Sequence, residues 1–253
     1  MTIVFKRILL KLSGEALSGD QGFGVEQQAV QKVSNNIKDV VELGCEVAIV
    51  IGGGNFLRGA VLHKDGFNQI TCDQMGMFAT VMNGLILRDG LLSSGVATHL
   101  MSAKQINSVA ETYDHHLADS YLRNGKVVIF SGGTGAPLFT TDSAAALRGI
   151  EINADIILKA TKVDGVYSAD PKVDASAELF KSLSYQEVLD QELGVMDLTA
   201  ICLCRDHNKK IRVFNMHKPN VLKDIVLGKE EGTLVSSLDL RRRNVGVKSR
   251  LET

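Results

Sequence analysis

The chain has 253 residues, of which 45% are hydrophobic and 23% are charged, and its formal net charge is −1. This length allows a sizeable buried core in one large domain or two small ones. The near-zero net charge excludes a global electrostatic field that would attract nucleic acid or an anionic membrane.

The N-terminal segment is apolar, but Lys6, Arg7 and Lys11 interrupt it. No apolar run reaches the roughly 18 residues that a membrane span needs, and no small-residue cleavage site follows an uninterrupted apolar core. The four cysteines form no C-x-x-C pair, and the six histidines show no metal-ligand spacing. We therefore expect a cytoplasmic protein with reduced cysteines, no protein-held metal, no membrane contact and no nucleic-acid partner.

Short apolar runs, each followed at once by Gly, Ser, Thr, Asn or a Lys-Ala-Thr string, predict the strands. They cover residues 8–12, 47–51, 127–130, 156–158 and 211–214. Near-continuous apolar strands are typical of a parallel sheet that is covered on both faces.

Helical patterns separate these runs, over residues 25–43, 75–92, 142–149, 198–206 and 220–227, with a capping box at 184–187. The pattern at 75–92 is apolar around most of its circumference, which is typical of a core helix or of a subunit interface. Asp142 is a candidate N-cap. The alternation predicts an α/β three-layer sandwich, with a central, mostly parallel sheet and helices on both faces, in one domain over residues 1–253.

The glycine-rich loops after these strands match neither of two common nucleotide-binding fingerprints. The Walker A string is absent, and the dinucleotide string G-x-G-x-x-G/A fails at both Gly52 and Gly133. The loops instead suggest a distributed phosphate cradle of glycine N–H groups and fixed cations. Taken alone, Lys11 either extends to the surface or points into a site, and the glycines either wrap phosphates or form tight turns.

Several longer strings together carry a specific resemblance: KLSGEAL at 11–17, IGGGNFLRG at 51–59, DQMGM at 73–77, GTGAPLFTTDSAA at 133–145, KATKVDGVYSADP at 159–171 and RVFNMHKP at 212–219. They resemble the bacterial uridylate kinases of the amino-acid-kinase superfamily, over about residues 6–232. The resemblance implies the amino-acid-kinase fold, an N-terminal lobe for UMP, a C-terminal lobe for ATP, and a homohexamer.

The resemblance also implies roles for individual residues in a transfer from ATP to UMP. Lys11 would contact the transferring phosphoryl group, Arg58 would lie near the point of transfer, and Asp142 would orient Lys11 and the shell of a Mg²⁺ ion. These three are the implied catalytic residues. Lys11, Arg58 and the following residues form the implied ATP site: Leu12, Ser13, Gly14, Gly54, Thr161, Tyr167 and Asp170.

The implied UMP site combines two segments. Asp73 would accept hydrogen bonds from the ribose hydroxyls, a task that suits a carboxylate. The other implied contacts are Gly53, Thr134, Gly135, Ala136, Pro137, Leu138, Phe139, Thr140 and Thr141. Ala136 and Leu138 stand where the common family string has Asn and Phe, so the preference for UMP over CMP depends on whether backbone groups alone recognise uracil.

The family is typically activated by GTP and inhibited by UTP. The residues that match its GTP segments are Gly19, Asp20, Gln21, Gly22, Phe23, Gly24 and Arg88. Leu92, His99 and Lys126 stand where other members often carry His, Arg and Arg. An ordinary solvated face is therefore the alternative interpretation.

The sequence disfavours three other functions. A kinase of the same superfamily that acts on a carboxylate or carbamate is disfavoured by D-Q-M-G-M and G-T-G-x-P-x-F-T-T-D, which accompany a nucleotide acceptor. A non-catalytic nucleotide-binding relative would lack the catalytic charges, whereas Lys11, Arg58 and Asp142 are all present. An oxidoreductase is disfavoured by the failed dinucleotide fingerprints.

Overall fold

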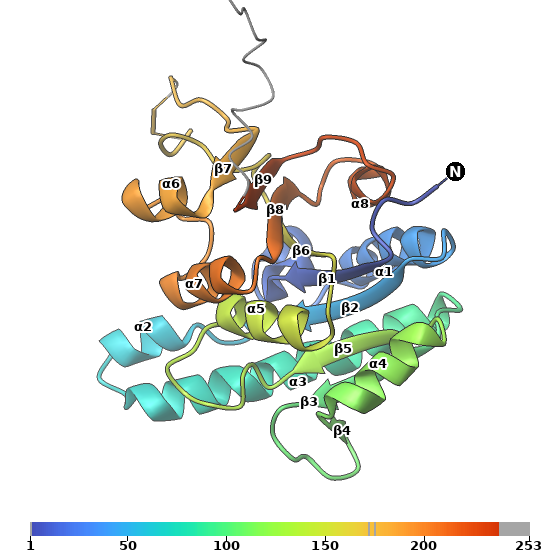
Figure 1. The fold of residues 1–253 in the computed structure, drawn as a ribbon. Helices are drawn as coiled ribbons and strands as arrows, with labels where there is room; N and C mark the ends of the chain where they lie inside the picture. Colours follow the sequence, from blue (N-terminus) through green and yellow to red (C-terminus); the bar gives the residue numbers. More distant parts are fainter. Residues whose placement is uncertain (1, 172, 175, 238–253) are drawn as a thin grey trace, which may run out of the picture.

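The computed structural model describes residues 2–171, 173–174 and 176–237. In this part of the chain, a nine-stranded sheet has the order β4-β3-β5-β2-β1-β6-β8-β9-β7 (Figure 1). The strands are β1 (Arg7–Leu12), β2 (Glu46–Ile51), β3 (Thr98–Ser102), β4 (Glu111–Thr112), β5 (Val127–Ser131), β6 (Ile156–Thr161), β7 (Ser182–Ser184), β8 (Lys210–Asn215) and β9 (Thr233–Ser236). Adjacent strands are parallel, except for the antiparallel pair β8–β9.

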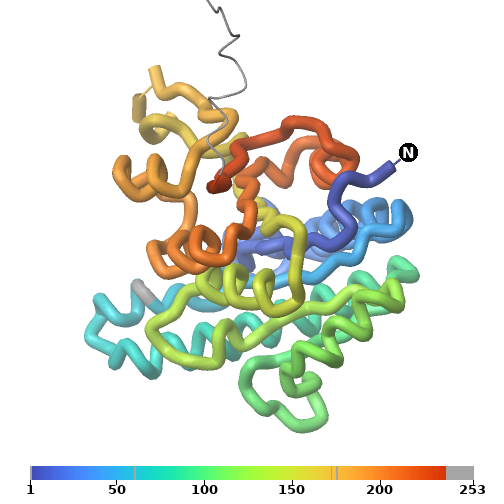
Figure 2. Tube along the Cα trace, in the orientation of Figure 1, coloured from blue at the N-terminus to red at the C-terminus, as the bar shows by residue number. Residues whose placement is uncertain are grey.

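Helices cover both faces of the sheet. One face carries α1 (Gln27–Val41), α3 (Gln69–Ser93) and α8 (Val221–Val226), and α2 (Gly59–Lys64) packs on α3. The other face carries α4 (His115–Arg123), α5 (Thr141–Glu151), α6 (Tyr185–Asp190) and α7 (Leu198–Asp206). Short 3₁₀ turns, η1 (Gly14–Ala16) and η2 (Gly19–Gln21), follow β1. Figure 2 shows the blue-to-green half of the chain at one end of the sheet and the orange-to-red part at the other.

The strands are buried on both faces, and this explains their apolar sequences. Leu10 and Leu12 of β1 pack into the core beneath α1 and α3, whereas Leu9 packs into the core beneath α5. Because successive side chains of a strand point to opposite faces, a two-sided core requires apolar residues at nearly every position. The predicted three-layer α/β architecture is confirmed.

Several predicted elements match closely. The predicted bounds of α7 are those observed, and the capping box is present, with Ser184 accepting from the Glu187 backbone and Glu187 accepting from the Ser184 backbone. The sequence analysis did not identify α2, β3, β4, α4, β7 or β9. These elements are short or partly polar, so they lack a long apolar period.

Two predicted helix starts were wrong. Helix α3 begins at Gln69 rather than at 75, with Asn68 as its N-cap, because its first turns are polar and carry no apolar period. Helix α5 is capped by Thr140, whose hydroxyl accepts from the backbone N–H groups of Asp142 and Ser143. Asp142 therefore lies in the first turn and is not the N-cap.

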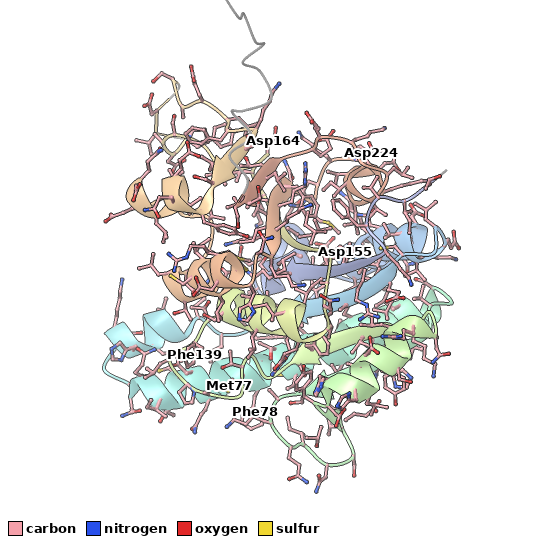
Figure 3. The ribbon with its side chains drawn as sticks, in the orientation of Figure 1. Met77, Phe78, Phe139, Asp155, Asp164 and Asp224 are labelled. Carbon is pink, nitrogen blue, oxygen red and sulfur yellow. The ribbon has the colours of Figure 1, made fainter. Side chains whose placement is uncertain are left out.

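The carboxylate of Asp155 links two strands at the edge of the sheet where their amino ends lie. Asp155 accepts from the backbone N–H groups of Lys6 and Arg7, at 2.7 and 2.9 Å, and so joins the start of β1 to the start of β6. Asp155 and Asp164, labelled in Figure 3, lie just before and just after β6. Among the described residues, no helix has both the length and the apolar character that crossing a bilayer requires.

Two glycines with the same backbone conformation provide a test of the fold. Gly22 and Gly232 both have φ of 71°, but Gly22 has open space around it, whereas a Cβ on Gly232 would overlap the carbonyl oxygen of Val213. We expect Gly22→Ala to lower the free energy of unfolding by about 1–2 kcal/mol, the penalty for a left-handed residue. Gly232→Ala should lower it by more than about 3 kcal/mol, beyond the usual range for single substitutions. Urea unfolding measures both, and equal losses would show that the contact with Val213 is unimportant.

Candidate active site

Two lysines lie side by side in the centre of the sheet. Lys11 of β1 and Lys159 of β6 are register partners in the parallel pairing of these strands. Their neighbours Leu10 and Leu158 pack beneath α1 and α3. The strand alternation therefore directs both lysines to the opposite face, where α5 begins.

Both ammonium groups meet one carboxylate in the first turn of α5. Lys11 Nζ lies 2.9 Å from Asp142 Oδ1, and Lys159 Nζ lies 2.9 Å from Asp142 Oδ2. All three side chains are less than one-fifth exposed. Lys159 also donates to the carbonyl of Val195 at 2.6 Å. With Asp142 ionised, this cluster of two cations and one anion carries a net positive charge.

The electrostatics keep Asp142 ionised. Burial alone would raise the pKa of Asp142, but the charges of Lys11 and Lys159 outweigh it and hold the pKa below its ordinary value. Burial lowers the pKa of Lys159; the carboxylate of Asp142 opposes this effect and the charge of Lys11 adds to it. A partly buried cluster with an excess positive charge favours an anion that reaches it from solvent.

A second carboxylate fixes the start of α5. Asp197 accepts from the hydroxyls of Thr140 and Ser143 and from the backbone N–H of Ala200. It therefore caps α7 and at the same time ties α7 to the turn that carries Asp142.

The loop after β1 is linked to Arg58. Arg58 Nη2 lies 2.5 Å from Glu15 Oε1, and Lys162 Nζ lies 3.7 Å from Glu15 Oε2. The guanidinium is mostly exposed, so it is available to a ligand from solvent. A cavity of about 320 Å³ opens beside this loop, and its lining includes Ser13, Glu15, Gly19, Asp20, Thr161 and Lys162.

The second glycine loop follows β2. A Cβ on Gly53 would come within 2.7 Å of the Ala79 side chain on α3, so the loop backbone lies directly on this helix. Gly54 has open space around it. Leu12 is fully buried, and its carbonyl accepts from the backbone N–H of Gly52 at 2.9 Å.

The two segments expected to hold UMP lie together. Asp73 of α3 accepts from the backbone N–H of Leu138 at 2.8 Å and from the side chain of Gln69 at 2.9 Å. Leu138 has φ of 72° and is 70% exposed, and Thr134 forms hydrogen bonds with the backbone of Ala136. The other residues expected at this site are Gly135, Pro137, Phe139 and Thr140 of the loop between β5 and α5, and Thr141 at the start of α5; Figure 3 labels Phe139 together with Met77 of α3.

The residues expected to hold adenosine follow β6. Thr161 ends this strand and donates to the carbonyl of Val163 at 2.7 Å. Tyr167 is half-buried and pairs with Leu179 in an isolated bridge, and Asp170 is exposed. They lie on the β8 side of the sheet order, whereas Asp73 and its loop lie on the β5 side.

The residues expected to bind GTP are separated within one chain. Arg88 lies on α3, on one face of the sheet. His99 stacks on Tyr121 of α4, on the other face, with ring centroids 3.6 Å apart, and Lys126 Nζ lies 3.4 Å from His99 Nε2. The segment from Gly19 to Gly24 lies after η1, and Phe23 in it is 69% exposed.

Two residues of this site, Lys159 and Asp197, were not among the site residues predicted from the sequence. The predicted strand ended at 158, so Lys159 was assigned to a loop, although its place in an apolar strand opposite Lys11 was a usable signal. Asp197 was missed although it directly precedes α7, the position that an N-cap occupies.

The described residues include no group of three or more His, Cys, Asp and Glu side chains that could hold a metal ion. Asp142 Oδ1 is buried and accepts no hydrogen bond of good geometry, although it is paired electrostatically with Lys11. One such oxygen fits a Mg²⁺ ion that keeps mostly phosphate and water ligands, as nucleotide-bound magnesium does.

Comparison with known proteins identifies the family. The model of the amino acid kinase family matches residues 6–215. The uridylate kinase of Pectobacterium atrosepticum is 58% identical over 233 residues, covering 92% of this chain and 97% of that protein, and the one of Colwellia psychrerythraea is 59% identical over 232 residues, with coverage of 92% and 94%. The crystal structure of UMP kinase from Bacillus anthracis superposes with a TM-score of 0.89 at 41% identity, covering 92% of this chain and 96% of that one. The chain belongs to the amino acid kinase family and, within it, to the uridylate kinases, which are nucleoside monophosphate kinases.

Proposed function

We propose that this protein transfers the γ-phosphoryl group of ATP to UMP and produces UDP and ADP in pyrimidine nucleotide synthesis. The observation that carries the proposal is the pairing of Lys11 and Lys159 with the single carboxylate of Asp142, near the carboxyl ends of the central strands β1 and β6. The printed names of the relatives agree with this reaction. We further propose a single domain in which the β5 side binds UMP and the β8 side binds ATP.

The proposed chemistry needs no general base. The acceptor is a phosphate of UMP, which carries no proton that must be removed before it attacks the γ-phosphorus. Catalysis then consists of alignment and stabilisation of charge on the transferring group. Lys11 and Lys159 supply fixed positive charge, and Asp142 sets the positions of both ammonium groups.

The other residues hold the two substrates. Arg58 leaves Glu15 to contact the ATP phosphates, with the N–H groups of Ser13, Gly14 and Gly54 around them. Asp73 holds the UMP ribose, and Thr161, Tyr167 and Asp170 hold the adenosine. Mg²⁺, when bound with ATP, would neutralise phosphate charge, and Asp142 is the carboxylate that would orient its water shell.

We propose a cytoplasmic homohexamer that GTP activates and UTP inhibits. The side chains of Phe78 and Met82 on α3 are 58% and 47% exposed, which gives this helix an apolar face suited to a subunit contact. Arg88 lies on one face of the sheet and the His99–Lys126 pair on the other, so we propose that a GTP site that uses both is shared between subunits.

The lysine cluster is tested by substitution. We expect Lys11→Ala and Lys159→Ala each to lower kcat by at least about 10²-fold, the range for removing one preorganised donor to the transition state. Lys38→Ala is the matched control, because Lys38 pairs with Glu42 on the exposed side of α1. A coupled assay of ADP release measures all three, and near-normal turnover in Lys11→Ala would refute the mechanism.

The substrate assignment is tested by offering UMP, CMP and dUMP at equal concentrations with ATP and Mg²⁺. We expect UMP to exceed the other two in kcat/KM by at least about tenfold, because a site built to hydrogen-bond a group rejects analogues that lack it. The Ala136→Asn variant shows whether a side chain at this position sharpens the preference. Comparable turnover of CMP would make the protein a broader pyrimidine kinase, and no turnover of any of the three would exclude the proposed reaction.

Effector control is tested in the same assay. We expect GTP to raise the rate of the wild-type protein and to raise it less in Arg88→Ala, because this variant lacks the cation that would pair with the GTP phosphates. Lys38→Ala again serves as the control, and UTP is added in a parallel series. An equal GTP response in the wild type and Arg88→Ala would remove Arg88 from the effector site.

A further inference from the structure

Two fully buried amides lie beneath the glycine loops. Asn55 belongs to the loop after β2 and Asn83 to the middle of α3, and neither is exposed to solvent. The core side of α3 is mostly apolar, and a buried amide there lowers stability unless its hydrogen bonds are made.

The two amides satisfy each other. Asn83 Nδ2 donates to Asn55 Oδ1 at 2.6 Å, and Asn55 Nδ2 donates to Asn83 Oδ1 at 3.0 Å. The second hydrogen of each amide goes to a backbone carbonyl, from Asn83 to Gly52 at 2.7 Å and from Asn55 to Gly24 at 2.7 Å. All four amide hydrogens thus have an acceptor, which makes the pair a rigid closed network.

The network touches the loop after β2 at one point and the connection between β1 and α1 at two points. It holds the carbonyl of Gly52, at the start of the loop that contains Gly53 and Gly54. It packs against Gly14, where a Cβ would lie 2.8 Å from Asn83 Nδ2 and closer still to Asn55 Oδ1. It also holds Gly24, whose own N–H donates to the carbonyl of Asn55 at 2.9 Å.

The same helix supports the loop after β5. Thr80, one turn before Asn83 on α3, accepts from the backbone N–H of Gly132 at 2.7 Å and donates to the carbonyl of Met77 at 2.6 Å. The core-facing polar side chains of α3 therefore contact both glycine loops, whereas Phe78 and Met82 on the same helix are exposed.

We propose that Asn55 and Asn83 are positioning residues for phosphoryl transfer: their amide pair fixes the loop at 52–54 relative to Gly14 and ties the segment ending at Gly24 to that loop. The inference rests on the proposed function for its catalytic consequence. The pair does not contact substrate, since both side chains are sealed from solvent. It acts through the backbone groups that it holds in place.

The first test is kinetic. We expect Asn83→Leu, which keeps the approximate volume and removes the donors, to lower kcat by about 10- to 10²-fold, the size of effect that a small misplacement of reacting groups produces. The KM values for ATP and UMP should change by a smaller factor than kcat. The control is Thr98→Val, because Thr98 is buried on β3 and its hydroxyl donates to the nearby carbonyl of Val96, away from the glycine loops.

The second test is amide hydrogen exchange, which needs neither substrate nor turnover. In the wild type, the Gly24 and Gly52 amides should exchange more slowly than those of residues 19–23. In Asn83→Leu, or in the milder Asn55→Ser if the former does not fold, exchange should rise at 24 and 52–57 and stay unchanged in α1. A folded variant with kcat within about twofold of wild type, or a wild-type Gly24 amide as fast as its neighbours, would overturn the proposal. If the wild type does not turn over UMP, the proposed function falls, while the exchange data still test the network.

Discussion

A single carboxylate, on a helix, links that helix to two parallel strands at the centre of this protein. Asp142 pairs with Lys11 of β1 and Lys159 of β6, and these strands are neighbours in the sheet. Removing Asp142 would leave two buried ammonium groups side by side without a compensating charge, whereas removing either lysine would leave a neutral pair. The strand order, the position of the first turn of α5 and the hydrogen bonds of Asp197 together determine where these three charged groups meet. The excess positive charge is available there because the surrounding core is apolar on both faces of the sheet.

The central strands could be predicted from the sequence because burial on both faces leaves a strong signal. β1, β2, β5, β6 and β8 appear as apolar runs, whereas β3, β4, β7 and β9 lie toward the edges, are short and carry polar residues. The N-cap of α5 was wrong because Thr140 and Asp142 are both capping residue types, and only the backbone geometry distinguishes them. Lys11 and Asp142 were predicted through motif resemblance, and their ion pair agrees with the predicted orientation of Lys11.

The residues that were not predicted, Lys159, Asp197 and the Asn55–Asn83 pair, derive their importance from three-dimensional contacts. Lys159 becomes prominent only when β6 is aligned beside β1, and Asp197 only when α7 is placed against α5. Asn83 is the one buried amide side chain of α3, and its partner Asn55 is 28 residues away in the chain. Propensity and periodicity cannot identify such pairs, because the free energy that keeps them comes from satisfying polar groups inside the core.

The charges of the proposed site differ in how easily they can be exchanged. The Arg58–Glu15 pair is exposed, and pairs of this kind contribute about 0–1 kcal/mol to stability. A polyphosphate can therefore replace Glu15 as the partner of Arg58 with almost no loss of folding stability. Breaking the buried pairs of Asp142 would lower the stability more. Arg58 therefore pairs with a carboxylate that a ligand can displace, close to the place where it is proposed to bind phosphate. The protein thus combines a buried charge cluster with an exposed ion pair, and a ligand that displaced Glu15 from Arg58 would leave the buried cluster intact.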